Sequence, residues 1–290
     1  MRQVTVGKMW MMAFLMAGFV VGCGSTQTST STTTPAGAPV GPPLGVTATF
    51  GSFGGGSGAT NQGINTVING DLGTTAASTS VTGFHDAGPG CTYTETGSNV
   101  GLVKGKIFTA APPPTVGCPS EGTATTAATA TQASVDAIAA WNSLSPASQP
   151  GGTDPGAGQL GAHVLAPGIY KAAGGSFLIT GTDLTLDAQG DANALWVFQA
   201  AGSLTVGAAG APRSVILVNG AQAKNVFWYV GSAATINAAG GGTMVGTIIA
   251  NSGVTFSTSG VTAITTLNGR ALALNASVTM VNTVINVPTP

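Results

Sequence analysis

Three aspartates spaced four residues apart are the first candidates for catalytic chemistry. Asp183, Asp187 and Asp191 lie in the segment TDLTLDAQGDAN, and such a spacing puts them on one face of a strand. Paired carboxylates can act as acid and base on a glycosidic bond, and the three could hold a structural calcium ion. No His, Lys or aromatic platform for a sugar lies nearby, and Asp191 is typical of a Gly-Asp turn. We therefore expect no enzyme, no catalytic metal and no cofactor, with structural calcium as the open alternative.

A second set of residues is uncharged and recurs along the chain. Five threonines each lie between two apolar residues, in short segments separated by Gly-rich turns: Thr185, Thr205, Thr235, Thr255 and Thr279. Their intervals of 20 to 30 residues indicate stacked coils of a β-solenoid. In such a stack the threonines form one outward column, about 4.8 Å apart. We expect their neighbours on the same strands to share that face, namely Ser203, Asn237, Ser257 and Ser277.

Other elements must complete the coils around this column. A second set of apolar strands is predicted at 194–199, 214–219, 225–230, 244–250 and 268–274. Arg270 in the last of these marks its face as distinct from the threonine column. One helix is predicted over 123–144, capped by Thr123 or Ser134, with Val135 and Ile138 on its buried face.

The two cysteines of the folded region fall in an irregular segment, 84–122. Neither Cys91 nor Cys118 has a second Cys or a His at metal-ligand spacing. Outside the cytoplasm such a pair forms a disulfide, and closing this loop would contribute about 3 kcal/mol by chain entropy. We predict a Cys91–Cys118 disulfide.

The N-terminal segment predicts export. Arg2 and Lys8 accompany the apolar run 9–22, which is too short to span a bilayer and fits a signal peptide. The run ends in VVGC, which resembles a bacterial lipobox and implies cleavage before Cys23 and lipidation of its thiol; an ordinary secretory signal is the alternative. We predict a signal peptide at 1–22, a Ser/Thr/Pro-rich tether at 23–43 and a folded domain at 44–290, anchored to the outer membrane or cell surface.

Composition narrows the possible partners. Only 6% of the 290 residues are charged, against about 25% in soluble domains, and the net charge is -1. The eight basic residues form no patch, which argues against nucleic-acid binding. We expect a monomer.

Several motifs of the folded region resemble the DUF3494 ice-binding-like family. They occur in the family's order and cover nearly all of 44–287: INTVINGDLGTT (64–75), VTGF (81–84), LAPGIYK (165–171), LTLDAQGDANALWVFQ (184–199), VILVNGAQAKNVFWYVGSAATI (215–236), MVGTIIA (244–250) and LNGRALALNASVTM (267–280). The resemblance implies a mainly β fold: an irregular right-handed β-helix of triangular cross-section, one long α-helix alongside, and a small disulfide-bearing cap at 84–122. It also implies adsorption to ice through one flat, weakly polar face of the solenoid.

The threonine column suits that activity. Thr combines a stiff χ1 with one methyl and one hydroxyl, and a face without charges imposes no strong hydration of its own. In parts of the family a T-A/G-x-T/N pattern marks the ice-binding face, and we do not find that pattern repeated in register here. The column is expected to end at Thr185 between Asp183 and Asp187. A cell-surface adhesin or structural module with the same fold is the competing function.

Overall fold

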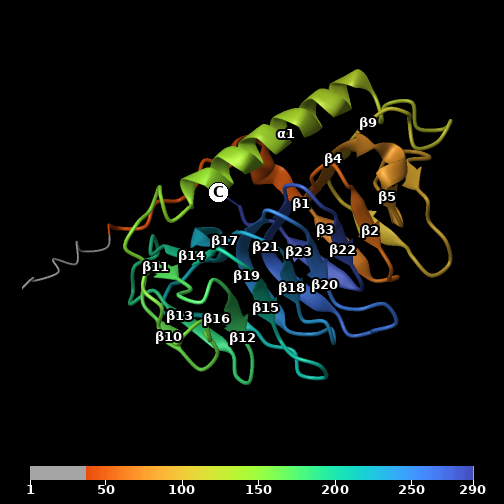
Figure 1. The fold of residues 1–290 in the computed structure, drawn as a ribbon. Coiled ribbons are helices and arrows are strands. Elements are labelled where there is room, and N and C mark those ends of the chain that lie inside the picture. The colour runs from red at the N-terminus through yellow and green to blue at the C-terminus, as the bar shows by residue number, and fades with distance from the viewer. Residues whose placement is uncertain (1–36, 290) are drawn as a thin grey trace, which may run out of the picture. The chain divides into compact units, whose positions relative to one another are not determined.

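The computed structural model describes residues 37–289, which lie within one compact unit, and shows a three-sided stack of short β-strands with a long helix alongside (Figure 1). The predicted signal peptide, Cys23 and the first part of the tether lie outside the described residues. Within 37–289, no helix has both the length and the apolar character needed to cross a membrane.

One side of the stack is a seven-stranded parallel sheet, which we call the Thr face. Each strand is short because the chain must turn a corner at both ends to reach the next side. In spatial order its strands are β12 (Phe177–Ile179), β15 (Leu204–Val206), β18 (Ala234–Ile236), β20 (Val254–Phe256), β22 (Val278–Met280), β2 (Ala59–Asn61) and β5 (Val81–Thr82).

A thirteen-stranded sheet supplies the other two sides. Its main path runs through β11 (Gly168–Lys171), β14 (Trp196–Ala200), β17 (Val226–Val230), β19 (Thr243–Ala250), β21 (Thr265–Ala273), β23 (Thr283–Asn286), β3 (Thr66–Asn69), β8 (Gly101–Val103), β6 (Phe84–His85) and β7 (Thr92–Tyr93). A branch runs from β21 through β1 (Phe50–Gly54) and β4 (Asp71–Ala77) to β9 (Ile107–Ala110).

The branch exists because β19 and β21 each belong to two sides. The first part of β21 pairs with β23, while Ala271–Ala273 pair with β1. Between these parts Gly246 and Gly269 lie opposite each other, and a Cβ on Gly269 would stand 1.8 Å from the carbonyl oxygen of Gly246. Only glycine allows the two strands to approach so closely at this corner.

A three-stranded sheet completes the third side. It comprises β10 (Val164–Leu165), β13 (Leu184–Asp187) and β16 (Val215–Val218). The start of β19 lies beside it, where the Thr243 amide donates to Ser214 Oγ at 3.0 Å. Short 3-10 turns occupy Gly45–Thr49 (η1), Ser78–Ser80 (η2) and Ala223–Asn225 (η3).

The coils are not stacked in the order of the chain. The last coil packs against the first, because β21, β22 and β23 pair with β1, β2 and β3 respectively. The chain therefore builds the end that contains β9, returns along the stack as a helix, and then builds coils back from β11 towards its own beginning. The predicted solenoid is confirmed, but sequence position does not give the position of a coil.

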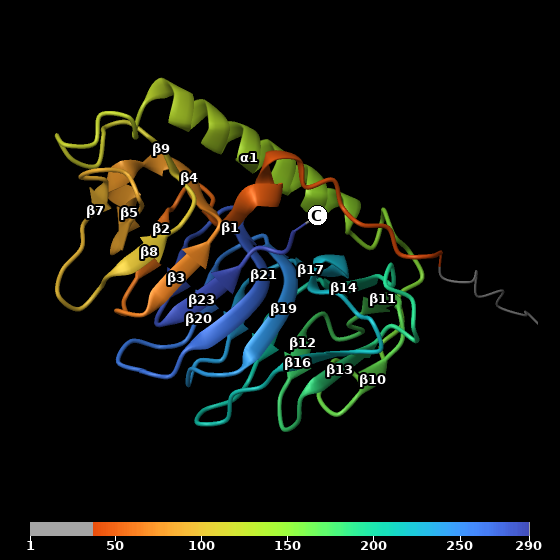
Figure 2. The ribbon, with the colours of Figure 1, turned by 180° about the vertical axis from the view of Figure 1, so that it is seen from behind.

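The helix α1 (Ala124–Ser143) makes this return (Figures 1 and 2). Its 20 residues span about 30 Å, close to the roughly 34 Å covered by seven strand spacings from β9 to β11. Thr123 caps its start by accepting from the Thr126 amide at 3.2 Å, as one of the two predicted caps. At its end Gln199, fully buried in β14, donates to the Leu144 carbonyl at 3.0 Å.

The buried face of α1 differs from the predicted one. Ala130, Ala133, Ala137 and Ala140 are fully buried, whereas Val135 and Ile138 are 55% and 44% exposed. The small alanine side chains let the helix lie close to Phe53, Val197, Phe227, Ile249 and Leu272 on the sheet beneath. A hydrophobicity pattern misses this face because alanine carries little hydrophobic signal, while its small size is what the close approach of helix and sheet requires.

A continuous apolar core fills the interior of the stack. Tyr170, Phe198 and Trp228 lie in register on β11, β14 and β17, with ring centroids 5.3 Å and 4.1 Å apart. The core continues through Ile248, Leu267 and Ile285 in the following coils. Inward apolar residues on every coil thus hold the three sides together.

Two expectations concern the N-terminal half of the chain, the disulfide and the tether. The Cys91–Cys118 disulfide is confirmed in the cap. Residues 37–43, assigned to the tether, contact the domain: the Val40 amide donates to Gln149 Oε1 at 3.0 Å, and Gln149 Nε2 donates back to the Val40 carbonyl at 2.8 Å. These two hydrogen bonds hold Val40 against the folded domain.

The close approach of α1 predicts an asymmetric response to larger side chains. Ala137→Leu should destabilise the domain by about 1–3 kcal/mol, because the added atoms have no space between helix and sheet. Ala139→Leu, on the exposed face of the same helix, should change stability by less than about 0.5 kcal/mol. Urea unfolding of both variants measures this, and equal effects would contradict the alanine interface.

Candidate functional site

One column of outward side chains runs the full length of the Thr face. Strand pairing places its seven members in register, and six of them are threonines: Leu178, Thr205, Thr235, Thr255, Thr279, Thr60 and Thr82. Thr255 is the fourth of the seven and is exposed, and the other threonines are half-buried. The side chain before each threonine points into the core, and in four of the six coils the one after it does so as well, as in Val254 and Phe256, both fully buried.

Thr60 and Thr82 are members that the sequence did not reveal. Thr60 is followed by Asn61 and Thr82 by Gly83, so neither has the apolar-Thr-apolar pattern. They join the column because the N-terminal coils stack on the last coil, which no local pattern indicates. The signal that could have found them is the similarity of SGAT (57–60) to SGVT (252–255).

Thr185 does not belong to this column, contrary to prediction. It lies in β13 on the third side, in register with Val164 and Ile216. Its place at the β11 end of the column is taken by Leu178, which is 40% exposed. The 20 residues from Thr185 to Thr205 therefore lead from one side of the stack to another and do not make one full coil.

Asn237 and Ser257 were also expected on the face, but both are buried at a corner. Asn237 is fully buried; it accepts from the Arg213 amide at 2.9 Å and donates to the Gly241 carbonyl at 2.8 Å. Ser257 is 3% exposed. Their positive φ values of 47° and 60° turn the chain off the Thr face directly after the strand, so their side chains point into the corner.

Ser203 and Ser277 flank the column as predicted, in a second column of small residues. Backbone hydrogen bonds stack Ser203, Ala233, Gly253 and Ser277 on successive coils. A Cβ on Gly253 would stand 2.8 Å from the Ser277 carbonyl oxygen. The close spacing of the coils at this column therefore favours the small residues Gly, Ala and Ser. As a result, no large side chain of this column projects beside the threonines.

A hydroxyl residue often begins the same four-residue unit. The unit reads hydroxyl, small, apolar, Thr in four coils: Ser57–Thr60, Thr79–Thr82, Ser232–Thr235 and Ser252–Thr255. The amide of Ser252 donates to the Ser232 carbonyl at 2.9 Å, so these first positions are stacked as well. The T-A/G-x-T/N pattern itself is not repeated, as expected; three of the four units instead have Ser in its first place and Ala or Gly in its second.

The three aspartates are separate turn residues. Asp183 accepts from the Ser214 amide at 2.9 Å, Asp187 from the Gln189 amide at 2.8 Å, and Asp191 from the Asn193 amide at 2.8 Å. The hydrogen bonds from Gln189 and from Asn219 lower the pKa of Asp187. Each carboxylate accepts a backbone hydrogen bond, which is local for Asp187 and Asp191 and comes from the residue before the neighbouring strand for Asp183. Asp183 and Asp187 lie on the third side and not at an end of the Thr face.

The two remaining sides of the stack offer less suitable binding surfaces. The helix α1 covers one of them. On the third, Asn268, Asn286 and Asn69 form a ladder in which each amide bonds to the next, at 2.9 Å and 2.6 Å. Arg270 is not a surface residue of another face as expected: it is 3% exposed and donates to the Ala48 carbonyl at 3.0 Å.

Comparison with known proteins identifies the family. The Ice-binding-like family matches residues 53–286, so the chain belongs to this family. An ice-binding protein of Nostoc sp. (strain HG1) is 38% identical over 200 residues, 66% of each chain. Ice-binding protein 1 of Shewanella frigidimarina is 40% identical over 124 residues, 42% of this chain and 13% of that protein. An ice-binding protein of Flavobacterium frigoris is 35% identical over 129 residues, 44% of this chain and 42% of that protein.

Solved structures agree with the fold. The DUF3494 domain of Shewanella frigidimarina ice-binding protein 1 aligns with a TM-score of 0.71 at 25% identity, covering 88% of this chain and 100% of that chain. An ice-binding protein from the Antarctic ascomycete Antarctomyces psychrotrophicus gives 0.62 at 30% identity, covering 87% of this chain and 100% of that one. All of these proteins are named for ice binding and not for a catalytic activity.

The corner assignment of Asn237 predicts a structural and not a surface role. Asn237→Ala should destabilise the domain by about 2–3 kcal/mol, because buried backbone groups of the corner lose their partners. Thr235→Val, two residues earlier on the Thr face, should stay within about 0.5 kcal/mol. Thermal and urea unfolding of both variants measure this difference. An Asn237→Ala variant as stable as the wild type would contradict the buried corner role and favour a surface role for Asn237.

Proposed function

We propose that this protein binds ice through the Thr face, and acts as an antifreeze or inhibitor of ice recrystallisation. The observation that carries the proposal is the in-register column of six threonines from Thr205 to Thr82. The family and the relatives support the same activity. Ice is the partner, and the protein acts as a monomer.

Flatness and rigidity favour the Thr face for this role. Its seven strands extend over about 29 Å at the strand spacing of roughly 4.8 Å. Every strand is bonded to its neighbours and backed by buried apolar side chains, so binding ice need not order a mobile surface. Rigid, repeated threonines can hold surface water in one fixed pattern, with methyl groups between anchoring hydroxyls.

The absence of charge from these strands supports the same conclusion. None of the residues in the seven strands is Asp, Glu, Lys or Arg. With Thr185 assigned to another sheet, Asp183 and Asp187 no longer interrupt an end of the column. An ionised side chain would hold its own hydration shell and compete with the ordering of water by neighbouring hydroxyls.

Replacement at the centre of the column tests the face. Thr255→Tyr should abolish most thermal hysteresis and recrystallisation inhibition, because the ring projects over coils only about 4.8 Å away. Its stability should change by less than about 0.5 kcal/mol, since Thr255 is exposed. Thr235→Tyr, one coil away, should behave alike.

Thr185→Tyr is the matched control. Thr185 is also an outward strand threonine, but it lies on the third side between Val164 and Ile216. This variant should keep full ice activity. An active wild type with an active Thr255→Tyr variant would exclude the Thr face, and an inactive wild type would favour the adhesin or structural module.

We also propose that Cys23 anchors the domain to the outer membrane or cell surface. The VVGC motif and the signal-like run before it support this. Cys23→Ser should move the protein from the membrane fraction to the soluble fraction or leave it unprocessed. Mass spectrometry of the wild-type N-terminal peptide should find the lipid; an unmodified thiol with unchanged fractionation would identify an ordinary secretory signal.

A further inference from the structure

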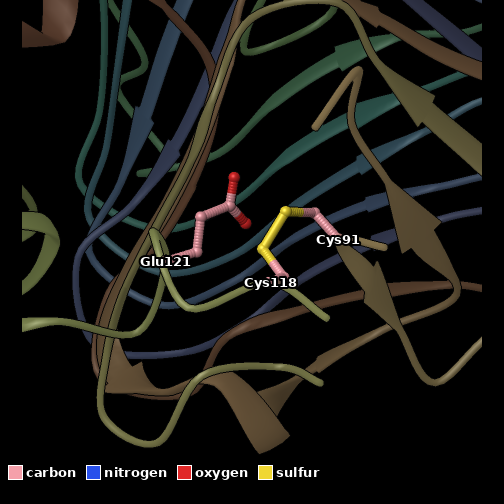
Figure 3. Close-up of side chains that lie close together, drawn as sticks. All are labelled: Cys91, Cys118 and Glu121. Carbon is pink, nitrogen blue, oxygen red and sulfur yellow. A yellow bond between two sulfur atoms is a disulfide. The ribbon is translucent and has the colours of Figure 1, made fainter. Parts of the chain in front are cut away.

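The cap contains a buried cluster of polar groups that the ice-binding face does not use. Glu121 and Asp86 are 7% and 8% exposed, and Tyr93 is 2% exposed. The Tyr93 hydroxyl donates to Glu121 Oε2. Figure 3 shows the Glu121 carboxyl beside the Cys91–Cys118 disulfide, and its oxygen lies within 4.8 Å of both sulfurs.

The cluster lies where three parts of the molecule meet. Glu121 is two residues before Thr123, which caps α1, while Tyr93 belongs to β7 of the cap. A cavity of about 670 Å³ lies between the loop after β6, the turn before β9 and the first turn of α1, and Asp86 and Glu121 both line it. The carboxyl groups are therefore buried, yet they border a space through which water and protons can reach them.

The protonation state of Glu121 depends on this environment. Burial raises its pKa to about 8, with the hydrogen bond and charge of Asp86 acting in the same direction, against opposing effects of Tyr93 and Lys106. Lys104 and Lys106 are the cations on the cavity wall, and the first turn of α1 has no acidic residue. Tyr93 stays protonated because burial raises its pKa further. Ionisation of Glu121 thus places a second negative charge beside Asp86 inside the cap.

We propose that Glu121, with Asp86 and Tyr93, is a proton-dependent latch that holds the cap closed and fixes the adjoining end of the Thr face. The connection to the face is short. Thr82 of β5 is followed by Gly83, whose amide donates to the Tyr93 carbonyl at 2.7 Å, and by Phe84, which pairs with Tyr93. The consequence for ice rests on the proposed function; the latch itself does not.

The cap also borders the end of the threonine column directly. A second cavity, of about 550 Å³, is lined by Thr60 and Thr82 from the column and by Ser98 and Asn99 from the cap. Movement of the cap would therefore displace the wall beside these two threonines. The rest of the column, from Leu178 to Thr279, lies on coils that the cap does not form.

The sign of the pH dependence follows from proton linkage. A closed cap binds the Glu121 proton more tightly than an open cap, in which the pKa of Glu121 returns to its ordinary value near 4.5. Closed-cap stability is therefore full below about pH 4.5, falls as pH rises to about 8, and is constant above that on account of this group. The opening equilibrium should rise by up to about tenfold per pH unit within this window.

Hydrogen exchange at pH 5 to 9, corrected for intrinsic exchange rates, tests the latch. In the wild type, protection of cap amides in β6 and β7 should fall steeply between pH 5 and 8, while that of β15 and β18 should not. Glu121→Gln keeps an acceptor for Tyr93 but cannot ionise, so its cap protection should not vary with pH. Asp86→Asn removes the negative charge of Asp86 that raises the pKa of Glu121. In this variant the pH at which cap protection stops falling should therefore lie below 8.

Glu95→Gln is the control variant, because it removes the other acid of the cap, which bonds His85 Nδ1 at 2.6 Å. It should keep the wild-type fall between pH 5 and 8. A flat wild-type profile, or the same fall in Glu121→Gln, would overturn the latch. If Glu121→Gln does not fold, the direction of the Asp86→Asn shift decides. Ice activity, measured separately at pH 6 and 9, is not needed for this result, so failure of the proposed function leaves the latch test intact.

Discussion

Parallel register between successive coils is the constraint on which the whole molecule depends. A single pairing, Thr235 with Thr255, also fixes the inward neighbours Ile236 and Phe256 and the corner that follows. Because side chains alternate along a strand, a slip of one residue would put threonine into the core and phenylalanine on the surface. Register thus produces the core and the Thr face in one step, and neither can be changed alone.

The corners enforce this register more strongly than the strands, which are only two or three residues long on the Thr face. Gly207, Asn237 and Ser257 follow the strands β15, β18 and β20 and all have positive φ. Asn237 adds side-chain hydrogen bonds to the loop that it begins. A short strand has few hydrogen bonds of its own, so a corner that defines where the strand ends also defines which residue sits at its centre.

Much of the fold followed from the sequence, because solenoids repeat. The coils, the disulfide between Cys91 and Cys118, the helix and its Thr123 cap were predictable from local patterns. The order of the coils was not, because nothing near Thr60 indicates that it stacks on Thr279. The same limitation assigned Thr185 to the wrong side: a period near 20 does not distinguish a full coil from a passage between two sides. The alanine face of α1 was hidden for another reason, since Ala carries little hydrophobic signal and is chosen there for its size.

The low charge of the chain follows from this architecture as much as from any function. Coils about 4.8 Å apart would bring like charges at equivalent positions into a repelling column, so outward columns favour neutral residues. The third side accordingly uses asparagines that bond to one another, at 2.6 Å between Asn69 and Asn286. The Thr face differs in that small residues such as Gly253 flank the threonines and keep the surface beside them low. Neutral, stacked side chains are thus common to the Thr face and the third side. On the third side the asparagine amides are already paired with one another, whereas the threonine column beside small residues leaves the Thr face able to order water.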